Sequence, residues 1–333
     1  MKKIGYLGAG AWGYCLANLL AANGHEVTLW ANDRLLIEMI KKNQEHPKFG
    51  GFRMQPGLRL TADLEEAINA KDYIVESVTS KGIRPVLERI TAIQPLNTPL
   101  ILTSKGIEQN SLLLLPEVVI DCLGEKFRPY VGCLSGPSLA EEVFQKMPTS
   151  VVSAAYEYSL SLEIKELFTN NFFRVYPNSD INGVSFGGAM KNIIAIASGI
   201  IDGLGFGQNS KAALITRGLH EMRKLSVMKQ ARAETLNGLS GLGDLCVTSL
   251  SLLSRNYKFG KLLAEGVPKE VARAKIGMVI EGEYTVVSAC QMSKISGIPI
   301  PISEAIFAII YEGLDPFEAV KGLLKREIKD EAL

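Results

Sequence analysis

The sequence predicts an α/β protein whose first half forms a doubly wound parallel sheet and whose second half is all-helical. Three observations carry this prediction. A chain of 333 residues exceeds what one hydrophobic core usually holds, so two domains are expected. Apolar, strand-like runs alternate with helical patterns through the first half, which is typical of a parallel sheet. After about Tyr176 the strand signals fade and long helical periodicities take over.

The strands expected in the first half are short apolar runs. They cover residues 3–7, 26–30, 73–77, 100–103, 130–134 and 150–153, and helical patterns at 11–23, 85–93 and 112–123 lie between several of them. The segment 45–57 is rich in Gly and Pro and is expected to be a loop that is mobile or faces a ligand. The order of these elements predicts a Rossmann-like first domain.

The second half shows helical patterns at residues 192–201, 211–228, 257–264, 268–274 and 285–296. We place the boundary near Tyr176, Pro177 and Asn178, where the pattern changes. This gives an α/β domain over residues 1–177 and a helical domain over 178–333.

The composition excludes several classes of protein. Thirty-six basic residues stand against 35 acidic ones, and a net charge of +1 argues against charge-driven binding of nucleic acid or of a membrane surface. The 5 cysteines contain no C-x-x-C pair, and the 3 histidines are not spaced as metal ligands. We therefore expect no metal site and no disulfide framework, and a reducing, cytoplasmic location.

The N-terminus resembles a secretory signal only superficially. Two lysines precede an uncharged run over residues 4–24, but that run holds four glycines in its first half, too many for a strong apolar helix. No other stretch is expected to be apolar enough to span a membrane, for which about 20 residues are needed. We expect a soluble protein without membrane insertion.

The glycines near the N-terminus fit a dinucleotide-binding loop. Gly8, Gly10 and Gly13 form G-x-G-x-x-G between an expected strand and an expected helix. They permit a tight turn, a close approach to a pyrophosphate and close helix packing, and the helix N-terminus offers N–H groups to the phosphates. Asp33 follows the second strand, where a carboxylate can hold a ribose hydroxyl. The alternative is a turn that merely connects strand to helix. Trp12 either packs beneath the helix or borders the diphosphate.

A lysine inside an apolar helical segment is the first candidate for chemistry. Lys191 is the only charged residue between positions 181 and 201. Such a lysine either extends its charge to water or works in a site, where desolvation lowers its pKa toward general-base duty. Asn192 beside it is a candidate to orient a carbonyl oxygen, or an ordinary solvent-facing amide. Lys105 falls at the carboxyl end of a strand, where open α/β sheets bind ligands; otherwise it is a surface lysine before a turn.

Further candidates lie in loops. Gly136 and Ser138 follow another strand, and Ser138 is expected either to contact a ligand or to cap a helix that opens at residue 139. Asp244 emerges from a glycine-rich run. Arg255, between Ser254 and Asn256, has the planar fork that suits a phosphate. Taken singly, each of these is as well explained by loop polarity.

Taken together, the motifs resemble the bacterial-type NAD(P)-dependent glycerol-3-phosphate dehydrogenase family. The matching pieces are Gly-Ala-Gly-Ala-Trp-Gly at 8–13, Ser-Lys-Gly at 104–106, Ser-Gly-Pro-Ser at 135–138, Phe-Arg-Val-Tyr at 173–176, Gly-Gly-Ala-Met-Lys-Asn at 187–192, Ala-Leu-Ile-Thr-Arg-Gly-Leu at 213–219, Gly-Leu-Gly-Asp-Leu at 241–245, Ser-Arg-Asn at 254–256 and Val-Ile-Glu-Gly at 279–282. The ordered set is specific although each piece is weak.

The resemblance implies an enzyme that reduces dihydroxyacetone phosphate to sn-glycerol 3-phosphate with NAD or NADP, and family habit suggests a homodimer. It implies that Lys191 is the proton acceptor when the alcohol is oxidised. From their positions in the sequence we expect Lys105, Asn192 and Asp244 to complete the catalytic set. The implied substrate contacts are Lys105, Gly136, Ser138, Lys191, Asp244, Ser254, Arg255 and Asn256. It also implies cofactor contacts at Trp12, Lys105, Ala140, Arg255, Val279 and Glu281. Together with the glycine loop and the residues after the second strand, the expected cofactor contacts are Gly8, Gly10, Ala11, Trp12, Gly13, Asn32, Asp33, Arg34, Lys105, Ala140, Arg255, Val279 and Glu281.

Two departures from the family pattern concern the cofactor. Ala11 stands where the family usually has Ser, which removes one hydroxyl donor to the pyrophosphate. The sequence Asn32-Asp33-Arg34 stands where many members carry His-Arg or Arg, so the choice between NAD and NADP stays open.

Two other functions fit parts of the sequence. A β-hydroxyacid dehydrogenase also joins a dinucleotide domain to a helical one with a catalytic lysine, but it typically has Asn four residues after that lysine, where this chain has Ala195. A nucleotide-binding redox sensor without turnover has no need of the charged set formed by Lys105, Lys191, Asp244 and Arg255.

Overall fold

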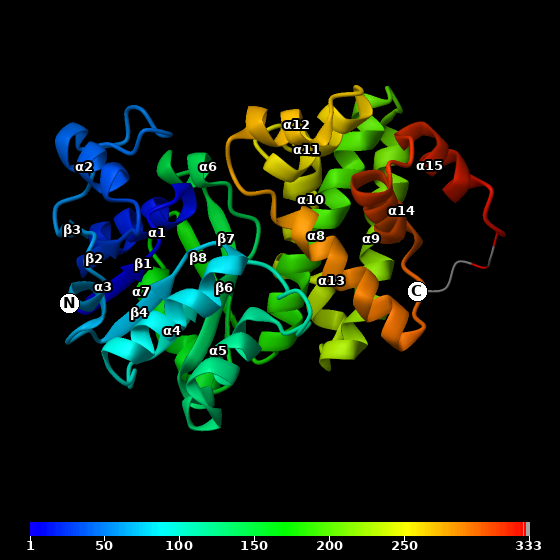
Figure 1. Ribbon diagram of the computed structural model, residues 1–333. Helices are drawn as coiled ribbons and strands as arrows, with labels where there is room; N and C mark the ends of the chain where they lie inside the picture. Colours follow the sequence, from blue (N-terminus) through cyan, green and yellow to red (C-terminus); the bar gives the residue numbers. More distant parts are fainter. Residues whose placement is uncertain (329, 331–333) are drawn as a thin grey trace. The chain divides into compact units, whose positions relative to one another are not determined.

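The computed structural model describes residues 1–328 and 330, which fold into two compact units (Figure 1). The first unit comprises Met1–Ser104 and Leu115–Ile181. The second comprises Lys105–Leu114 and the chain from Asn182 onward. The chain therefore passes from one unit to the other three times.

An eight-stranded sheet forms the centre of the first unit. Its strands are β1 (Lys3–Leu7), β2 (Glu26–Trp30), β3 (Leu58–Thr61), β4 (Tyr73–Glu76), β5 (Leu100–Leu102), β6 (Val131–Ser135), β7 (Thr149–Ala155) and β8 (Phe173–Asn178). They lie in the order β3-β2-β1-β4-β5-β6-β7-β8. Strands β1 to β6 run parallel, whereas β7 pairs antiparallel with β6 and parallel with β8. The reversal of strand order beside β1 is the arrangement of a Rossmann-like sheet, which confirms the predicted fold class.

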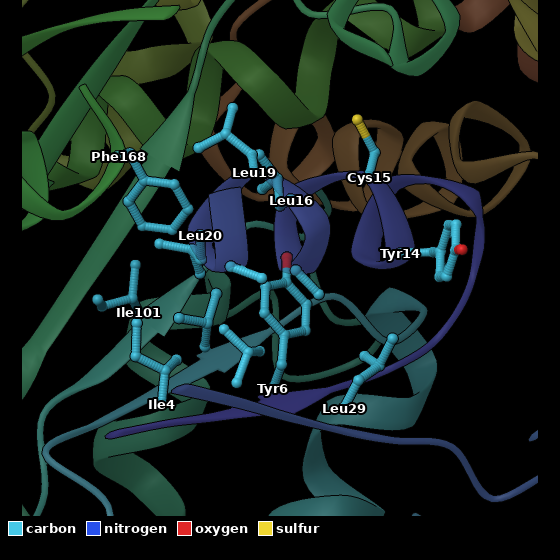
Figure 2. Close-up of a cluster of buried hydrophobic side chains, with 14 of the residues drawn as sticks. Ile4, Tyr6, Tyr14, Cys15, Leu16, Leu19, Leu20, Leu29, Ile101 and Phe168 are labelled. Atoms are coloured by element: carbon cyan, nitrogen blue, oxygen red, sulfur yellow. The ribbon is translucent and has the colours of Figure 1, made fainter. Parts of the chain in front are cut away.

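Helices cover both faces of this sheet (Figure 1). They are α1 (Ala11–Ala22), α2 (Arg34–Asn43), α3 (Leu64–Ile68), α4 (Ile83–Ile93), α5 (Leu115–Leu123), α6 (Ala140–Phe144) and α7 (Tyr158–Phe168). Helix α1 packs beside α6 and α7, while α4 packs beside α3 and α5. Figure 2 shows Leu16 and Leu20 of α1 over Ile4 and Tyr6 of β1, and all four side chains are fully buried. This contact fixes the start of α1 above the end of β1.

The second unit is built from helices, as predicted. They are α8 (Ile181–Gly203), α9 (Gln208–Ser226), α10 (Asp244–Leu250), α11 (Arg255–Ala264), α12 (Lys269–Ile276), α13 (Glu281–Ser296), α14 (Pro301–Phe307) and α15 (Pro316–Leu324). Helix α8 is long and apolar enough to cross a membrane, contrary to the expectation from sequence, but 94% of its apolar window is buried inside the protein. It is the core helix of this unit, because its apolar residues pack against the surrounding helices.

Glycines bring α8 and α11 into backbone contact. A Cβ added at Gly199 of α8 would collide with the carbonyl oxygen of Tyr257 in α11, and one added at Gly260 of α11 would collide with that of Ile196 in α8. The two helices cross closely because neither position has a side chain. As a result, the residues that begin α11 are fixed relative to α8.

The structure differs from the predicted domain boundary in two respects. The change of unit falls after Ile181, three residues beyond the end of β8, rather than after Pro177. The segment Lys105–Leu114 also belongs to the second unit, because Ile107 and Leu114 lie in its core and the Ser288 hydroxyl of α13 donates to the carbonyl of Ile107 at 3.2 Å. A single domain boundary along the chain, as predicted, cannot assign residues 105–114 to the second unit.

Candidate active site

In the first unit the glycine loop has the geometry that a pyrophosphate requires. Gly8 has φ +106°, which L side chains rarely adopt, and Gly13 packs against the carbonyl oxygen of Gly8. A Cβ added at Gly10 would meet nothing within 4 Å, so the space in front of this residue is open. Helix α1 begins at Ala11 directly after it. The loop therefore leaves space in front of Gly10, directly before the N-terminus of α1, where helix N–H groups could meet a phosphate.

Three polar residues follow β2, and their surroundings differ. Asn32 accepts a hydrogen bond from Arg89 Nη1 at 3.1 Å through its Oδ1. Asp33 is the N-cap of α2, where its Oδ1 accepts from the N–H of Leu36 at 3.1 Å. Arg34 is exposed as the first residue of α2. The capping bond is a structural role for Asp33 that the sequence analysis did not assign, and it leaves the carboxylate at the surface.

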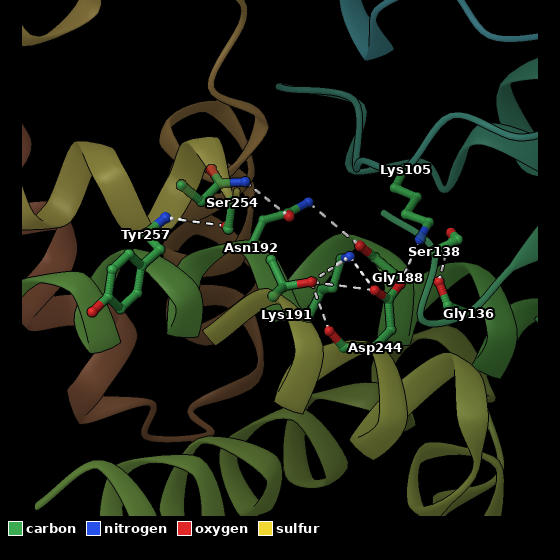
Figure 3. A network of polar contacts seen from close by, with 11 residues as sticks. Lys105, Gly136, Ser138, Gly188, Lys191, Asn192, Asp244, Ser254 and Tyr257 are labelled. Carbon is green, nitrogen blue, oxygen red and sulfur yellow. Dashed lines mark hydrogen bonds and ion pairs between the residues drawn. The ribbon is translucent and has the colours of Figure 1, made fainter. Parts of the chain in front are cut away.

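The remaining first-unit candidates lie on α1 and around α6. Trp12 is half-buried at the edge of the first core, so it is not a fully buried packing residue. Gly136 has φ +146° beside Val151, and the Ser138 hydroxyl donates to the carbonyl of Gly136 at 3.0 Å (Figure 3). Helix α6 begins at Ala140 with Leu139 as its N-cap, so the prediction that Ser138 caps a helix is wrong. The chain turns for one more residue before the helix starts.

In the second unit a single carboxylate joins two lysines. Asp244, the first residue of α10, is 1% exposed and forms ion pairs with Lys105 and Lys191 (Figure 3). The Nζ atom of Lys105 lies 2.5 Å from Asp244 Oδ2, and Lys191 contacts Oδ1. Residues far apart in the chain thus form one cluster of two amino groups and one carboxylate. When both lysines are protonated, the excess positive charge suits an anionic substrate or an oxyanion.

Close backbone packing brings Asp244 to α8. A π-helical turn, η5 (Leu239–Gly243), precedes α10, and Gly241 within it packs against the backbone of Leu236. Gly187 of α8 lies against the same turn, since an added Cβ would lie 2.8 Å from the oxygen of Ser240. The glycine-rich run allows the turn to approach α8, and π-helical turns often occur at functional sites.

Burial controls the ionisation of Lys191. The side chain is 7% exposed, and loss of solvation lowers its pKa to about 7, although the charge of Asp244 favours the cation. The nearby Lys105 cation also lowers it. A lysine with this pKa exists in both protonation states near neutral pH, as general acid–base chemistry requires.

Thr248 is a member of this cluster that the sequence analysis did not select. Its hydroxyl accepts from Lys191 Nζ at 2.8 Å and donates to the carbonyl of Asp244 at 2.6 Å. It lies one helical turn after Asp244 on α10, so the i, i+4 spacing was the signal available in the sequence. The threonine orients the ammonium group of Lys191 from the side.

Asn192 connects α8 to two other elements. Its Oδ1 accepts from Asn256 Nδ2 at 2.9 Å, and Asn256 Oδ1 accepts from the N–H of Gly282 at 2.9 Å. Asn192 Nδ2 donates to the carbonyl of Gly188 at 3.4 Å. Asn192 is buried, so the alternative of a solvent-facing amide is excluded. The chain of amides holds the starts of α11 and α13 against α8.

Arg255 and its neighbours form the other part of the second-unit site. Ser254 is the N-cap of α11, and its hydroxyl accepts from the N–H of Tyr257 at 3.2 Å. Arg255 Nη1 donates to the carbonyl of Val279 at 2.9 Å, and burial lowers the guanidinium pKa while the charge of Glu281 raises it. The guanidinium is thus held in place beside the segment that leads into α13.

The predicted site residues therefore fall into two sets. The first unit holds the residues of the glycine loop, the end of β2 and the turn before α6, namely Gly8, Gly10, Ala11, Trp12, Gly13, Asn32, Asp33, Arg34, Gly136, Ser138 and Ala140. The second unit brings together Lys105, Lys191, Asn192, Asp244, Ser254, Arg255, Asn256, Val279 and Glu281.

Two family models match nearly the whole chain. Residues 3–161 match the N-terminal model of NAD-dependent glycerol-3-phosphate dehydrogenase, and residues 180–321 match the C-terminal model of the same family. The chain belongs to the NAD-dependent glycerol-3-phosphate dehydrogenase family. This membership confirms the resemblance found in the motifs.

Curated members of the glycerol-3-phosphate dehydrogenase family are similar over their full length. The glycerol-3-phosphate dehydrogenase [NAD(P)+] of Protochlamydia amoebophila is 56% identical over 333 residues, which is 100% of both chains. That of Chlamydia pneumoniae is 52% identical over 332 residues, 100% of this chain and 99% of the relative. The crystal structure of glycerol-3-phosphate dehydrogenase from Coxiella burnetii superposes with a TM-score of 0.93 at 37% identity, covering 98% of this chain and 99% of the other.

Membership of the glycerol-3-phosphate dehydrogenase family decides between the functions that the sequence left open. Full-length relatives at 56% and 52% identity carry the name glycerol-3-phosphate dehydrogenase [NAD(P)+], whereas the β-hydroxyacid dehydrogenase and the sensor without turnover fit only parts of the sequence. The protein is an NAD(P)-dependent oxidoreductase of this family.

Proposed function

We propose that the protein reduces dihydroxyacetone phosphate to sn-glycerol 3-phosphate, reversibly, with NADH or NADPH, and so feeds glycerophospholipid synthesis. The observation that carries the proposal is the buried cluster in which Asp244 joins Lys105 and Lys191. Its charges and the lowered pKa of Lys191 match the needs of carbonyl reduction. The activity named for the full-length relatives supports the choice of substrate.

Lys191 is the proposed proton donor in the reduction. A bound nicotinamide supplies the hydride that C2 of the ketone receives. Negative charge then develops on the carbonyl oxygen, and the Lys191 ammonium stabilises it and gives it a proton. In the reverse direction neutral Lys191 accepts that proton. Because its pKa is about 7, neither transfer requires an unfavourable protonation state at neutral pH.

Lys105 and Asp244 are proposed to prepare this lysine and the carbonyl. Asp244 holds both ammonium groups and keeps them close together against their repulsion. Lys105 adds a second positive charge toward the developing oxyanion. Asn192, through its bond to Asn256, is proposed to position this set rather than to contact the reacting oxygen.

The phosphate of the substrate is proposed to bind at the start of α11. Arg255 offers a planar guanidinium, and Ser254 and Asn256 flank it with neutral polar groups. The resemblance also gives Gly136 and Ser138 of the first unit as substrate contacts. Binding energy at the remote phosphate orients the reacting end of the substrate.

The glycine loop is proposed to hold the cofactor pyrophosphate through Gly8, Gly10, Gly13 and the N-terminus of α1. Ala11 and Trp12 extend this contact surface. Ala140, Val279 and Glu281 are the further cofactor contacts that the resemblance implies.

Cofactor choice is proposed to depend on the residues after β2. The Asp33 carboxylate favours the ribose hydroxyls of NAD and repels a 2′-phosphate by roughly 1 kcal/mol or more, while Arg34 acts in the opposite direction. We expect NADH to be used at least comparably to NADPH. Measurement of kcat/KM for both cofactors in Asp33→Ala and Arg34→Ala tests this, and a strong NADPH preference that is lost in Arg34→Ala would contradict it.

The decisive experiment is a spectrophotometric assay of NADH oxidation with dihydroxyacetone phosphate. Turnover with this substrate and little with a β-keto acid supports the proposal. Turnover only with the keto acid supports the β-hydroxyacid alternative, and cofactor binding without turnover supports the sensor.

We also propose a cytoplasmic location and a homodimeric state, the latter from family habit.

A further inference from the structure

The loop between α2 and β3 carries a buried histidine that contacts the glycine loop. His46 is 3% exposed, and its Nε2 lies 3.1 Å from the carbonyl oxygen of Ala9. Its Nδ1 lies 3.1 Å from the backbone nitrogen of Lys48, which can only donate. Nδ1 is therefore the acceptor, and in the neutral ring the hydrogen is on Nε2. His46 thus donates a hydrogen bond to the oxygen of Ala9.

The surroundings of His46 favour this neutral form. Its ring packs against Tyr14 of α1 at 5.3 Å and against Phe49 at 5.6 Å between centroids. Burial lowers the pKa of His46; the hydrogen bond to the Ala9 carbonyl acts in the opposite direction, and the positive charge of Lys48 lowers the pKa again, so that it lies below its ordinary value. Through His46, the segment expected to be mobile or to face a ligand is tied to the loop that the pyrophosphate would approach.

The contacted carbonyl occupies a sensitive place in the chain. Ala9 lies between Gly8, with φ +106°, and Gly10, in front of which the space is open. Two glycines leave the peptides between them with more rotational freedom than any other residue type allows. A peptide is planar and trans, so a bond that fixes the Ala9 oxygen also fixes the direction of the Gly10 N–H on the opposite edge. His46 supplies such a bond from outside the loop.

We propose that His46 is a positioning residue for dinucleotide binding, which acts by holding the peptide between Ala9 and Gly10 in the orientation that accepts the pyrophosphate. The proposal rests on the proposed role of the glycine loop. His46 itself does not touch the reacting atoms. It lowers the entropy that the loop loses when the cofactor binds, because the peptide is already ordered.

His46→Leu and His46→Gln test the proposal. Leu keeps an apolar side chain against Tyr14 but has no donor, whereas the amide nitrogen of Gln can reach the position of Nε2. The dissociation constant for NADH is measured by titration calorimetry without substrate, and amide hydrogen exchange of residues 8–13 is measured without cofactor. We expect His46→Leu to raise Kd roughly tenfold and to speed exchange in the loop, because the peptide is then ordered only when NADH binds. His46→Gln should recover most of both.

Phe52→Leu is the matched control, because Phe52 packs in the same aromatic cluster against Phe49 and Phe144 but its side chain has no hydrogen-bond donor to offer the Ala9 carbonyl. It should leave Kd within about twofold even where it lowers the melting temperature. In His46→Leu, kcat at saturating NADH and the KM for dihydroxyacetone phosphate should stay near wild type. An unchanged Kd in His46→Leu, no recovery in His46→Gln, or an equal rise in Phe52→Leu would each overturn the proposal. Failure of the wild-type protein to bind NADH would instead overturn the proposed function.

Discussion

At Lys191, burial and ion pairing act on the pKa in opposite directions. Loss of solvation lowers it, Asp244 raises it, and the outcome is a value of about 7. Ion pairing alone would have kept the lysine charged and unable to accept a proton near neutral pH. Burial alone would have left an unpaired charge inside the protein at high cost. The combination gives an ordered side chain that exchanges its proton readily.

Replacement of this lysine should stop the chemistry without preventing cofactor binding. We expect Lys191→Met to lower kcat by ~10²-fold or more, because proton transfer and charge stabilisation are both lost. The Kd for NADH, measured calorimetrically, should stay near wild type, since Lys191 is not among the proposed cofactor contacts. A variant with near-normal kcat would show that Lys191 is only a buried structural residue.

The pH dependence of the two directions should be opposite. Reduction uses the Lys191 cation, so its kcat should fall as pH rises through about 7, and oxidation of glycerol 3-phosphate should rise over the same range. Steady-state rates from about pH 5.5 to 9 measure this dependence. The interval extends about 1.5 to 2 pH units on either side of the pKa of Lys191. Lys211→Met is a control, because Lys211 is also buried but its partner Asp202 raises its pKa. Lys211→Met should keep the wild-type pH profile, and loss of the inflection near pH 7 in this variant would argue against the assignment to Lys191.

Arg255 provides a test of substrate recognition. Arg255→Ala should cost about 2–4 kcal/mol in kcat/KM for dihydroxyacetone phosphate, because a charge-assisted contact to phosphate is lost. Dihydroxyacetone, which has no phosphate, should be reduced equally poorly by both proteins. Arg273→Ala, which breaks ion pairs with Glu270 and Glu283 instead, is the control and should not change the ratio between the two substrates. A loss with both substrates alike would assign Arg255 to the cofactor or to the fold.

At the scale of elements, sequence patterns predicted the regular parts of the fold better than the irregular ones. Strands β1 and β2 were predicted to the residue, because each is a buried apolar run between turn residues. Two strands were not predicted. Strand β3 is only four residues long, and strand β8 alternates buried and exposed residues and contains a proline. Helix α8 was predicted only from residue 192, since its first half contains three glycines with low helix propensity.

The contact between α8 and α11 has a direct mutational test. Gly260→Ala should lower the free energy of unfolding by about 1–3 kcal/mol, because the added Cβ would meet the backbone of Ile196, which cannot rotate away. Gly322→Ala is the matched control, since Gly322 lies in helix α15 with nothing within 4 Å of an added Cβ. It should be neutral or stabilising by up to ~1 kcal/mol. Denaturant unfolding of both variants measures this, and equal effects would contradict the close crossing.

For the candidate site, the motifs predicted the individual residues, but the contacts between these residues depend on long-range packing. Asp244 and Lys191 lie 53 positions apart and Lys105 lies 139 positions from Asp244, so no periodicity along the chain pairs them. The capping role of Asp33 was missed for a local reason. A short polar side chain before a helix serves equally as a cap and as a ligand contact, and the sequence alone does not separate the two.

For the whole molecule, the proposed dimer is open to measurement. Two exposed leucines lie close together near the end of α10. Leu250, at the end of α10, is 55% exposed, and Leu252, in the turn before α11, is 64% exposed. Exposed apolar residues close together often mark a protein contact. We expect sedimentation equilibrium at micromolar concentration to give twice the 36.2 kDa of one chain. Leu252→Ser should weaken this association, while Leu324→Ser, at an exposed leucine of α15, serves as a control. A single species of one chain's mass would contradict the proposed dimer.

Because Lys105–Leu114 belongs to the second unit, one recombination event between the genes of two relatives cannot transfer that unit whole. Exchange of coding segments between relatives at one joint near residue 181 would transfer the helical unit without this segment. Lys105 would then come from one parent and Asp244 from the other, although the two form one ion pair. The core positions of Ile107 and Leu114 would be divided in the same way. Functional chimaeras with divergent relatives should therefore exchange residues 105–114 together with the helices, as a double exchange.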